Sequence, residues 1–62
     1  MTDAERIDAW CRGRAGRVPA LEHLTGARAV TLSAWRSGQS APPSDARAIL
    51  EWIGAVPREV SL

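Results

Sequence analysis

Apolar residues recur at helical spacing in four stretches of the chain, which glycine and proline separate. In the first stretch the apolar positions are Ala4, Ile7, Trp10 and Cys11. Thr2 followed by Glu5 has the spacing of a capping box, which predicts a first helix that begins at residue 3. Gly13 and Gly16 predict the end of this helix and a short connection to the next one.

Residues 17–38 predict two short helices joined by a tight turn. The apolar positions are Val18, Ala20, Leu21 and Leu24 in the first of these helices, and Ala27, Val30, Leu32 and Trp35 in the second. We expect the first helix to start near Arg17, because Pro19 is compatible with a first helical turn. Gly26 can adopt the left-handed conformation that ends a helix. The second helix is expected over residues 27–36.

Residues 44–54 predict a further helix that is apolar around more than half of its circumference. We expect Ser44 to cap it, because the prolines before Ser44 exclude helix there. One apolar stripe consists of Ala46, Ile49, Leu50 and Ile53, and a second consists of Ala48, Trp52 and Val56. The first stripe is expected to pack on the two preceding helices. The second stripe, with Val60 of an irregular or briefly helical tail at 55–62, is expected to contact another subunit. The alternative is that Trp52 only covers the core.

The size and composition of the chain limit the classes of protein to which it can belong. Sixty-two residues make one small domain (1–62) of marginal stability. The single cysteine excludes an internal disulfide, and no Cys/His cluster indicates a metal or another cofactor. Cys11 is expected to be a small core side chain. A partner subunit is then the usual additional support, so we expect a homodimer.

No apolar run approaches the roughly 20 residues of a membrane span, and the acidic start does not resemble a signal peptide. We therefore expect a soluble, cytoplasmic protein.

The charge is small overall but unevenly distributed. The formal net charge is +1. Residues 1–8 contain three acids and one arginine, and residues 41–62 contain three acids and two arginines. Residues 9–40 contain five arginines and one acid, Glu22. The positive charge thus lies on the stretch with the two short helices, which is typical of a nucleic-acid interface.

Leu21, Leu32 and Trp35 form one apolar set if the second short helix crosses the first steeply, which is the geometry of a helix-turn-helix. Residues 17–38 resemble the motif of the lambdoid-phage Cro and repressor family and its bacterial relatives. The matching residues are Ala20-Leu21, Thr25-Gly26-Ala27, Thr31-Leu32-Ser33 and Trp35-Arg36-Ser37-Gly38. Glu22 departs from the pattern, which usually has alanine there. The resemblance implies an all-α domain of four to five helices with the motif as its second and third.

The resemblance also implies which residues contact DNA. The residues carried over to base edges in the major groove are Arg28, Ala29, Val30, Ser33 and Ala34. Those carried over to phosphates are Arg14, Arg17, Thr31, Arg36, Ser37 and Gln39. Arg28 is able to bind guanine through two hydrogen bonds or to lie on a phosphate, and the apolar side chains can pack on thymine methyl groups.

The expected function is that of a Cro-like repressor that binds double-stranded operator DNA as a dimer, in a bacterial or phage-infected cell. The alternative is a protein-interaction module, such as an antirepressor or an antitoxin-like partner, because the predicted base-reading face is only weakly polar. We do not expect an enzyme, since no nucleophile and base have a recognisable spacing. His23 lacks such a partner and is expected on the surface. We also do not expect regulation by a small molecule within this chain, since its 62 residues are occupied by a DNA-binding domain and a modest dimer contact.

Overall fold

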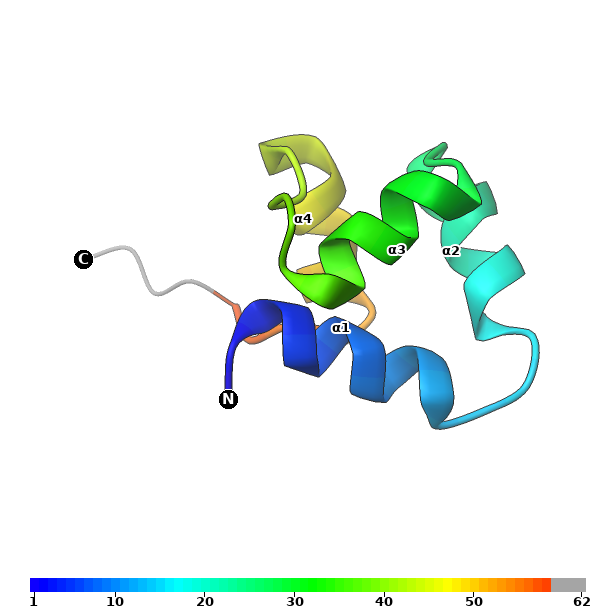
Figure 1. Ribbon diagram of the computed structural model, residues 1–62, viewed down its shortest axis with the longest axis horizontal. Helices are drawn as coiled ribbons and strands as arrows, with labels where there is room; N and C mark the ends of the chain where they lie inside the picture. The colour runs from blue at the N-terminus through cyan, green and yellow to red at the C-terminus, as the bar shows by residue number, and fades with distance from the viewer. Residues whose placement is uncertain (59–62) are drawn as a thin grey trace.

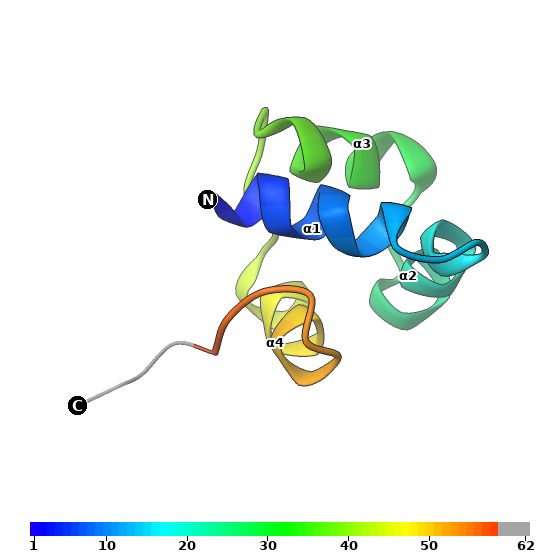
Figure 2. The ribbon, with the colours of Figure 1, turned by 90° about the horizontal axis from the view of Figure 1, so that it is seen from below.

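The computed structural model describes residues 1–58, which form four helices and no strand (Figure 1). The helices are α1 (Asp3–Arg12), α2 (Arg17–Thr25), α3 (Ala29–Ser37) and α4 (Ser44–Trp52). The prediction of an all-helical fold is therefore confirmed for this part of the chain. Seen from below, α1 lies between α3 and α4, and α2 lies beyond its carboxyl end (Figure 2).

The start of α1 has the capping box that the sequence predicts. The backbone N–H of Glu5 donates to the Thr2 hydroxyl at 3.2 Å, and the Thr2 N–H donates to the Glu5 carboxylate at 2.8 Å. The Thr2 hydrogen bonds hold the pKa of Glu5 below its usual value. Two amide groups that the helix itself leaves without a partner are thus satisfied, which fixes where α1 begins.

The connection between α2 and α3 is longer than predicted. Gly26 ends α2 in the left-handed conformation at φ 72°, but α3 begins at Ala29 and not at Ala27. The Thr25 hydroxyl accepts the Ala27 N–H at 3.2 Å, and Arg28 is extended at φ −82° and ψ 162°. The expected start was wrong by two residues because this local hydrogen bond competes with helix formation.

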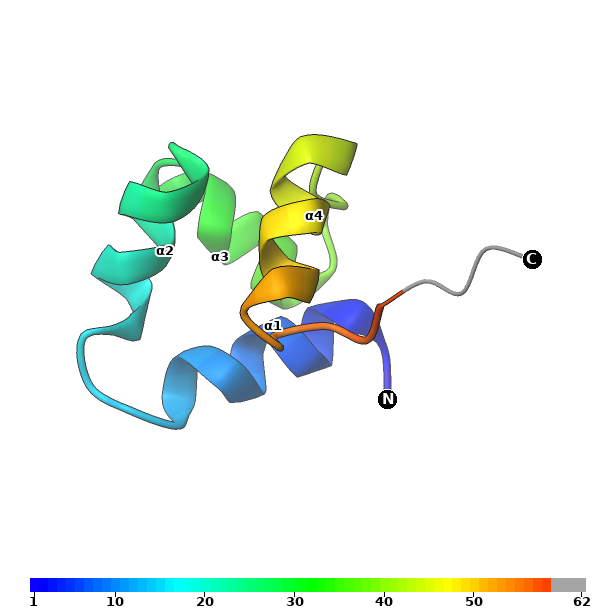
Figure 3. The same ribbon diagram turned by 180° about the vertical axis from the view of Figure 1, so that it is seen from behind.

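Both ends of α4 differ from the expectation, and the earlier carboxyl end changes the position of Val56. Pro43, not Ser44, occupies the capping position, and the helix ends at Trp52. Gly54, at φ 82°, then turns the chain back, and the N–H groups of Ala55 and Val56 donate to the Leu50 carbonyl (Figure 3). Val56 therefore does not continue the helical stripe of Trp52.

One core joins all four helices. Its fully buried large side chains are Ile7 of α1, Leu21 of α2, Leu32 of α3 and Leu50 of α4. Cys11, Trp35, Ala46, Ala55 and Val56 complete the buried set. Ala20 and Leu24, which were assigned to the apolar stripe of α2, are exposed instead. The short α2 contributes Leu21 to the buried set, and its partly buried Val18 packs against the core.

Arg47 of α4 joins three parts of the chain. Its guanidinium pairs with Asp3 at the start of α1 and with Glu51 one turn later in α4. It also donates to the carbonyl of Pro57, which follows the turn at Gly54. These contacts hold the start of α1 and the segment after α4 against one another.

Candidate nucleic-acid interface

The first turns of α3 present an exposed face opposite its buried side. Leu32 and Trp35 anchor the helix, with Leu32 only 1% exposed. On the opposite side, Val30 is 74% exposed. Of the other residues predicted to read bases, Arg28, Ala29 and Ser33 are exposed and Ala34 is partly buried. Thr31, predicted to bind phosphate, is also partly buried.

The amino termini of α2 and α3 have no side-chain cap. Gly16 precedes α2 at φ 85°, and Arg28 precedes α3 with extended backbone; neither position provides a side-chain hydrogen bond to the helix. The first N–H groups of a helix have no partner within it, and the helix dipole places partial positive charge at that end. Both helix starts can therefore accept an anion such as a phosphate.

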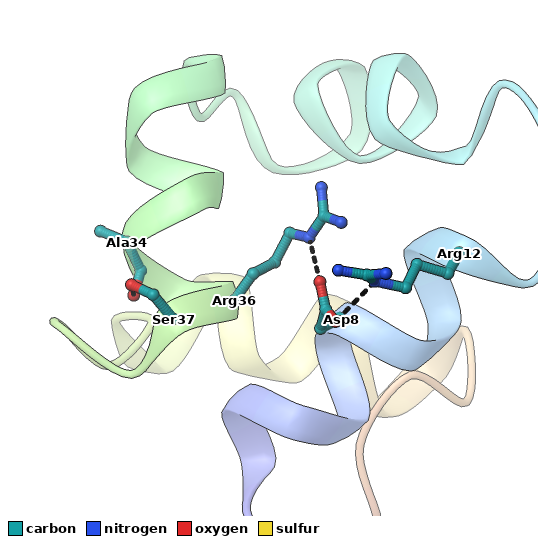
Figure 4. A network of polar contacts seen from close by, with 5 residues as sticks. All are labelled: Asp8, Arg12, Ala34, Arg36 and Ser37. Atoms are coloured by element: carbon teal, nitrogen blue, oxygen red, sulfur yellow. Dashed lines mark hydrogen bonds and ion pairs between the residues drawn. The ribbon is translucent and has the colours of Figure 1, made fainter.

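Arg36, at the end of α3, forms an ion pair with α1. Its Nε donates to Asp8 Oδ1 at 2.8 Å, and Arg12 Nε donates to the other oxygen, Oδ2, at 2.8 Å (Figure 4). The hydrogen bond from Arg36 is the main reason that the pKa of Asp8 lies below its usual value, with a smaller contribution from the charge of Arg12. Sequence reasoning assigned Arg36 to phosphate but missed Asp8 and Arg12, because their contact with Arg36 depends on how α1 packs on α3.

Arg17 also has a partner within the chain. Its Nη1 donates to the carbonyl of Trp10 at 2.8 Å, and its guanidinium carbon lies 4.4 Å from the centre of the Trp10 ring. This cation–π contact joins the end of α1 to the start of α2. Arg14, in the connection between these helices, is exposed.

Two predicted phosphate contacts lie at the carboxyl end of α3, Ser37 as its last residue and Gln39 just after it. The Ser37 hydroxyl donates to the Ala34 carbonyl at 3.2 Å, and in Figure 4 this side chain points away from the Arg36 guanidinium. The Ser37 proton therefore has an acceptor within the helix. Gln39 has an exposed side chain, and its backbone N–H donates to the same carbonyl at 3.0 Å.

The residues predicted at a subunit interface separate into three cases. Trp52 is 77% exposed on α4. Val56 is 3% exposed and belongs to the core, so its assignment to the interface was wrong; the turn at Gly54 directs it inward. Val60 lies outside the described residues.

The remaining candidate groups are unremarkable. Cys11 is buried, as expected, and burial raises the pKa of its thiol. His23 is exposed on α2. Within residues 1–58, no three His, Cys, Asp or Glu side chains are grouped so that they could hold a metal ion. None of the four helices has both the length and the apolar character of a membrane span.

Comparisons with models of protein families, with curated protein sequences and with solved structures gave no match to this chain.

Proposed function

We propose that the protein is a sequence-specific regulator of transcription that binds double-stranded DNA, with α2 and α3 as its helix-turn-helix. In this proposal α3 enters the major groove, and Arg28, Ala29, Val30, Ser33 and Ala34 face the bases. The binding of a repressor at its operator would block access of the polymerase. The protein has no catalytic role in this proposal.

The observation that carries the proposal is the two-sided character of α3. Leu32 and Trp35 hold the helix on the core, while its opposite side and its uncapped start are open to a ligand. A helix that reads DNA must expose its first turns in this way, because the major groove admits one helix and the base edges lie at its floor. Arg28 immediately precedes these turns and has an exposed side chain.

The proposed regulator acts as a homodimer. Two-fold symmetry places one α3 in each half-site, about 34 Å apart along the duplex. Of the expected interface residues within 1–58, Trp52 is exposed to a second subunit and Val56 is not. Tryptophan is enriched at protein–protein interfaces and among the residues that contribute most to binding there.

The proposal is tested by measuring duplex binding of the wild type, Arg28→Ala and Arg36→Ala over a range of salt concentrations. Affinity should fall steeply with salt, since each neutralised phosphate releases counterions. Arg36→Ala should weaken binding to every duplex alike, whereas Arg28→Ala should relax sequence preference at one base pair, by about 1–3 kcal/mol. Equal, salt-independent binding by all three proteins would contradict the proposal.

The second candidate function is a protein-interaction module, which the exposed Val30 favours. An aliphatic side chain that is 74% exposed at the centre of the α3 face suits an apolar partner as well as a thymine methyl group. The salt series separates the two functions, because a contact through Val30 would strengthen or stay constant as salt rises.

A further inference from the structure

A hollow lies at the junction of α1 and α3, next to the exposed face of α3. It has a volume of about 420 Å³ and is lined by Asp8, Arg12, Ser33, Arg36 and Ser37. Three of these residues carry charge, and together they amount to one net positive charge. The hollow is thus lined both by the end of α3 and by Arg12 of α1, which the sequence did not assign to DNA binding.

Asp8 binds both arginines, one through each of its carboxylate oxygens. Each guanidinium uses its Nε–H for the carboxylate, Arg36 on Oδ1 and Arg12 on Oδ2, both at 2.8 Å. In Figure 4 the two guanidinium groups lie on the same side of Asp8, and the terminal nitrogens of Arg36 point away from the carboxylate. A guanidinium has four further N–H groups on its terminal nitrogens, arranged as a fork that matches the oxygens of a phosphate.

The side chains of Asp8, Arg12 and Arg36 differ in their exposure to solvent. The side chains of Asp8 and Arg36 are only 29% and 27% exposed, whereas that of Arg12 is 74% exposed. Arg36 is therefore restrained by its surroundings as well as by Asp8, and Arg12 reaches further into solvent. An arginine that is already ordered loses less conformational entropy when it binds an anion than a free one does.

We propose that Asp8, Arg12 and Arg36 form a site for one phosphate group, in which Asp8 is a positioning residue and the two arginines bind the phosphate oxygens. This inference rests on the proposed function, since the phosphate it assigns is one of the DNA backbone beside the groove that α3 enters. Asp8 acts through the arginines: it orients both forks toward the same point while it keeps their mutual repulsion low.

The sign of the effect of Asp8→Asn distinguishes positioning from simple repulsion. A carboxylate near DNA repels phosphate, so its removal should tighten binding if that were its only role. If Asp8 positions the arginines, its removal should weaken binding although the protein gains one positive charge. We expect roughly a tenfold loss of affinity for any duplex, the size of one charge-assisted contact.

Arg12→Ala is the second variant, and Arg6→Ala is its matched control. Arg6 lies on the same helix and is exposed, but helical spacing places it away from the side that carries Asp8 and Arg12. Arg12→Ala should weaken binding roughly tenfold and reduce the salt slope by about one, whereas Arg6→Ala should change both only slightly. Equal effects of the two substitutions, or tighter binding by Asp8→Asn, would overturn the proposal. Circular dichroism at the binding temperature establishes that each variant is folded.

A pyrophosphate titration keeps this proposal distinct from the proposed function. The Nε–H resonances of Arg12 and Arg36 are followed by NMR in the wild type and in Asp8→Asn. Shifts that saturate in the wild type and are lost in Asp8→Asn support the phosphate site, even if no duplex is bound and the DNA function fails. Absence of saturable shifts, together with duplex binding that Arg12→Ala leaves intact, would show that the hollow is not a phosphate site.

Discussion

The orientation of α3 can be tested by two substitutions on opposite sides of the same helix, Leu32→Ala and Val30→Ala. Each shortens an aliphatic side chain to a methyl group. Leu32 is 1% exposed and packs in the core, whereas Val30 is 74% exposed. The same type of change should therefore have opposite consequences at positions only two residues apart.

The magnitudes follow from burial. Truncating a buried leucine costs about 2–5 kcal/mol, from the lost transfer free energy and the cavity that remains. A domain of this length has a free energy of unfolding of only about 3–9 kcal/mol. With roughly 4–8 °C of Tm per kcal/mol, Leu32→Ala should lower the Tm by at least about 8 °C, or leave the domain unfolded. Val30→Ala should change stability by less than about 0.5 kcal/mol, and in the favourable direction, since alanine has the higher helix propensity.

Thermal unfolding followed by far-UV circular dichroism measures both effects at one protein concentration. The wild type and the two variants should give one transition each, with Val30→Ala at or slightly above the wild-type Tm. A large loss of stability in Val30→Ala would mean that this side of α3 is packed against something. In that case the open face on which the proposed DNA contacts depend does not exist.

Three further predictions concern Asp8, Gly26 and Trp52. Because the pKa of Asp8 is lowered in the folded state, its ion pairs stabilise the fold fully above the unfolded-state pKa near 3.8, and this stabilisation is lost as the pH falls through the folded-state pKa. The difference in Tm between the wild type and Asp8→Asn should therefore be constant near neutral pH and vanish in acid. A difference in Tm that grows in acid would contradict this. Gly26→Ala should lower the free energy of unfolding in urea by about 1–2 kcal/mol, because φ is 72° there. An added Cβ meets no atom within 4 Å, so the cost is one of backbone conformation alone. An unchanged urea midpoint would show that α2 can end in another conformation. Trp52→Ala should leave the Tm of dilute protein unchanged, since the indole is 77% exposed, but should weaken self-association in sedimentation equilibrium; association that persists in this variant would place the subunit contact elsewhere.

The parts of the fold that depend on local sequence were predictable. The capping box of Thr2 and Glu5 and the left-handed Gly26 use residues within a few positions of one another, so their geometry follows from spacing and residue type. The start of α3 was missed because a threonine hydroxyl, outside the helical pattern, binds the Ala27 N–H. The inward position of Val56 was missed because helical periodicity was continued past the point where Gly54 turns the chain.

The exposed residues of the candidate interface were also predictable, whereas their partners were not. Periodicity separates Val30 from Leu32 on α3, since the two lie on different sides of any helix. The contact between Asp8 and Arg36 joins residues 28 positions apart, and the stacking of Arg17 on Trp10 requires a specific turn at residues 13–16. Both depend on how α1 packs against its neighbours, which the one-dimensional pattern does not contain.

Selection of bound duplexes from a random pool is the most direct test of the proposed reading of DNA by α3. The wild-type protein should enrich one sequence made of two inverted half-sites whose centres are about one helical turn apart, and Arg28→Ala should enrich a version degenerate at one position of each half. A pool that remains random after repeated rounds with folded protein would contradict the proposed function.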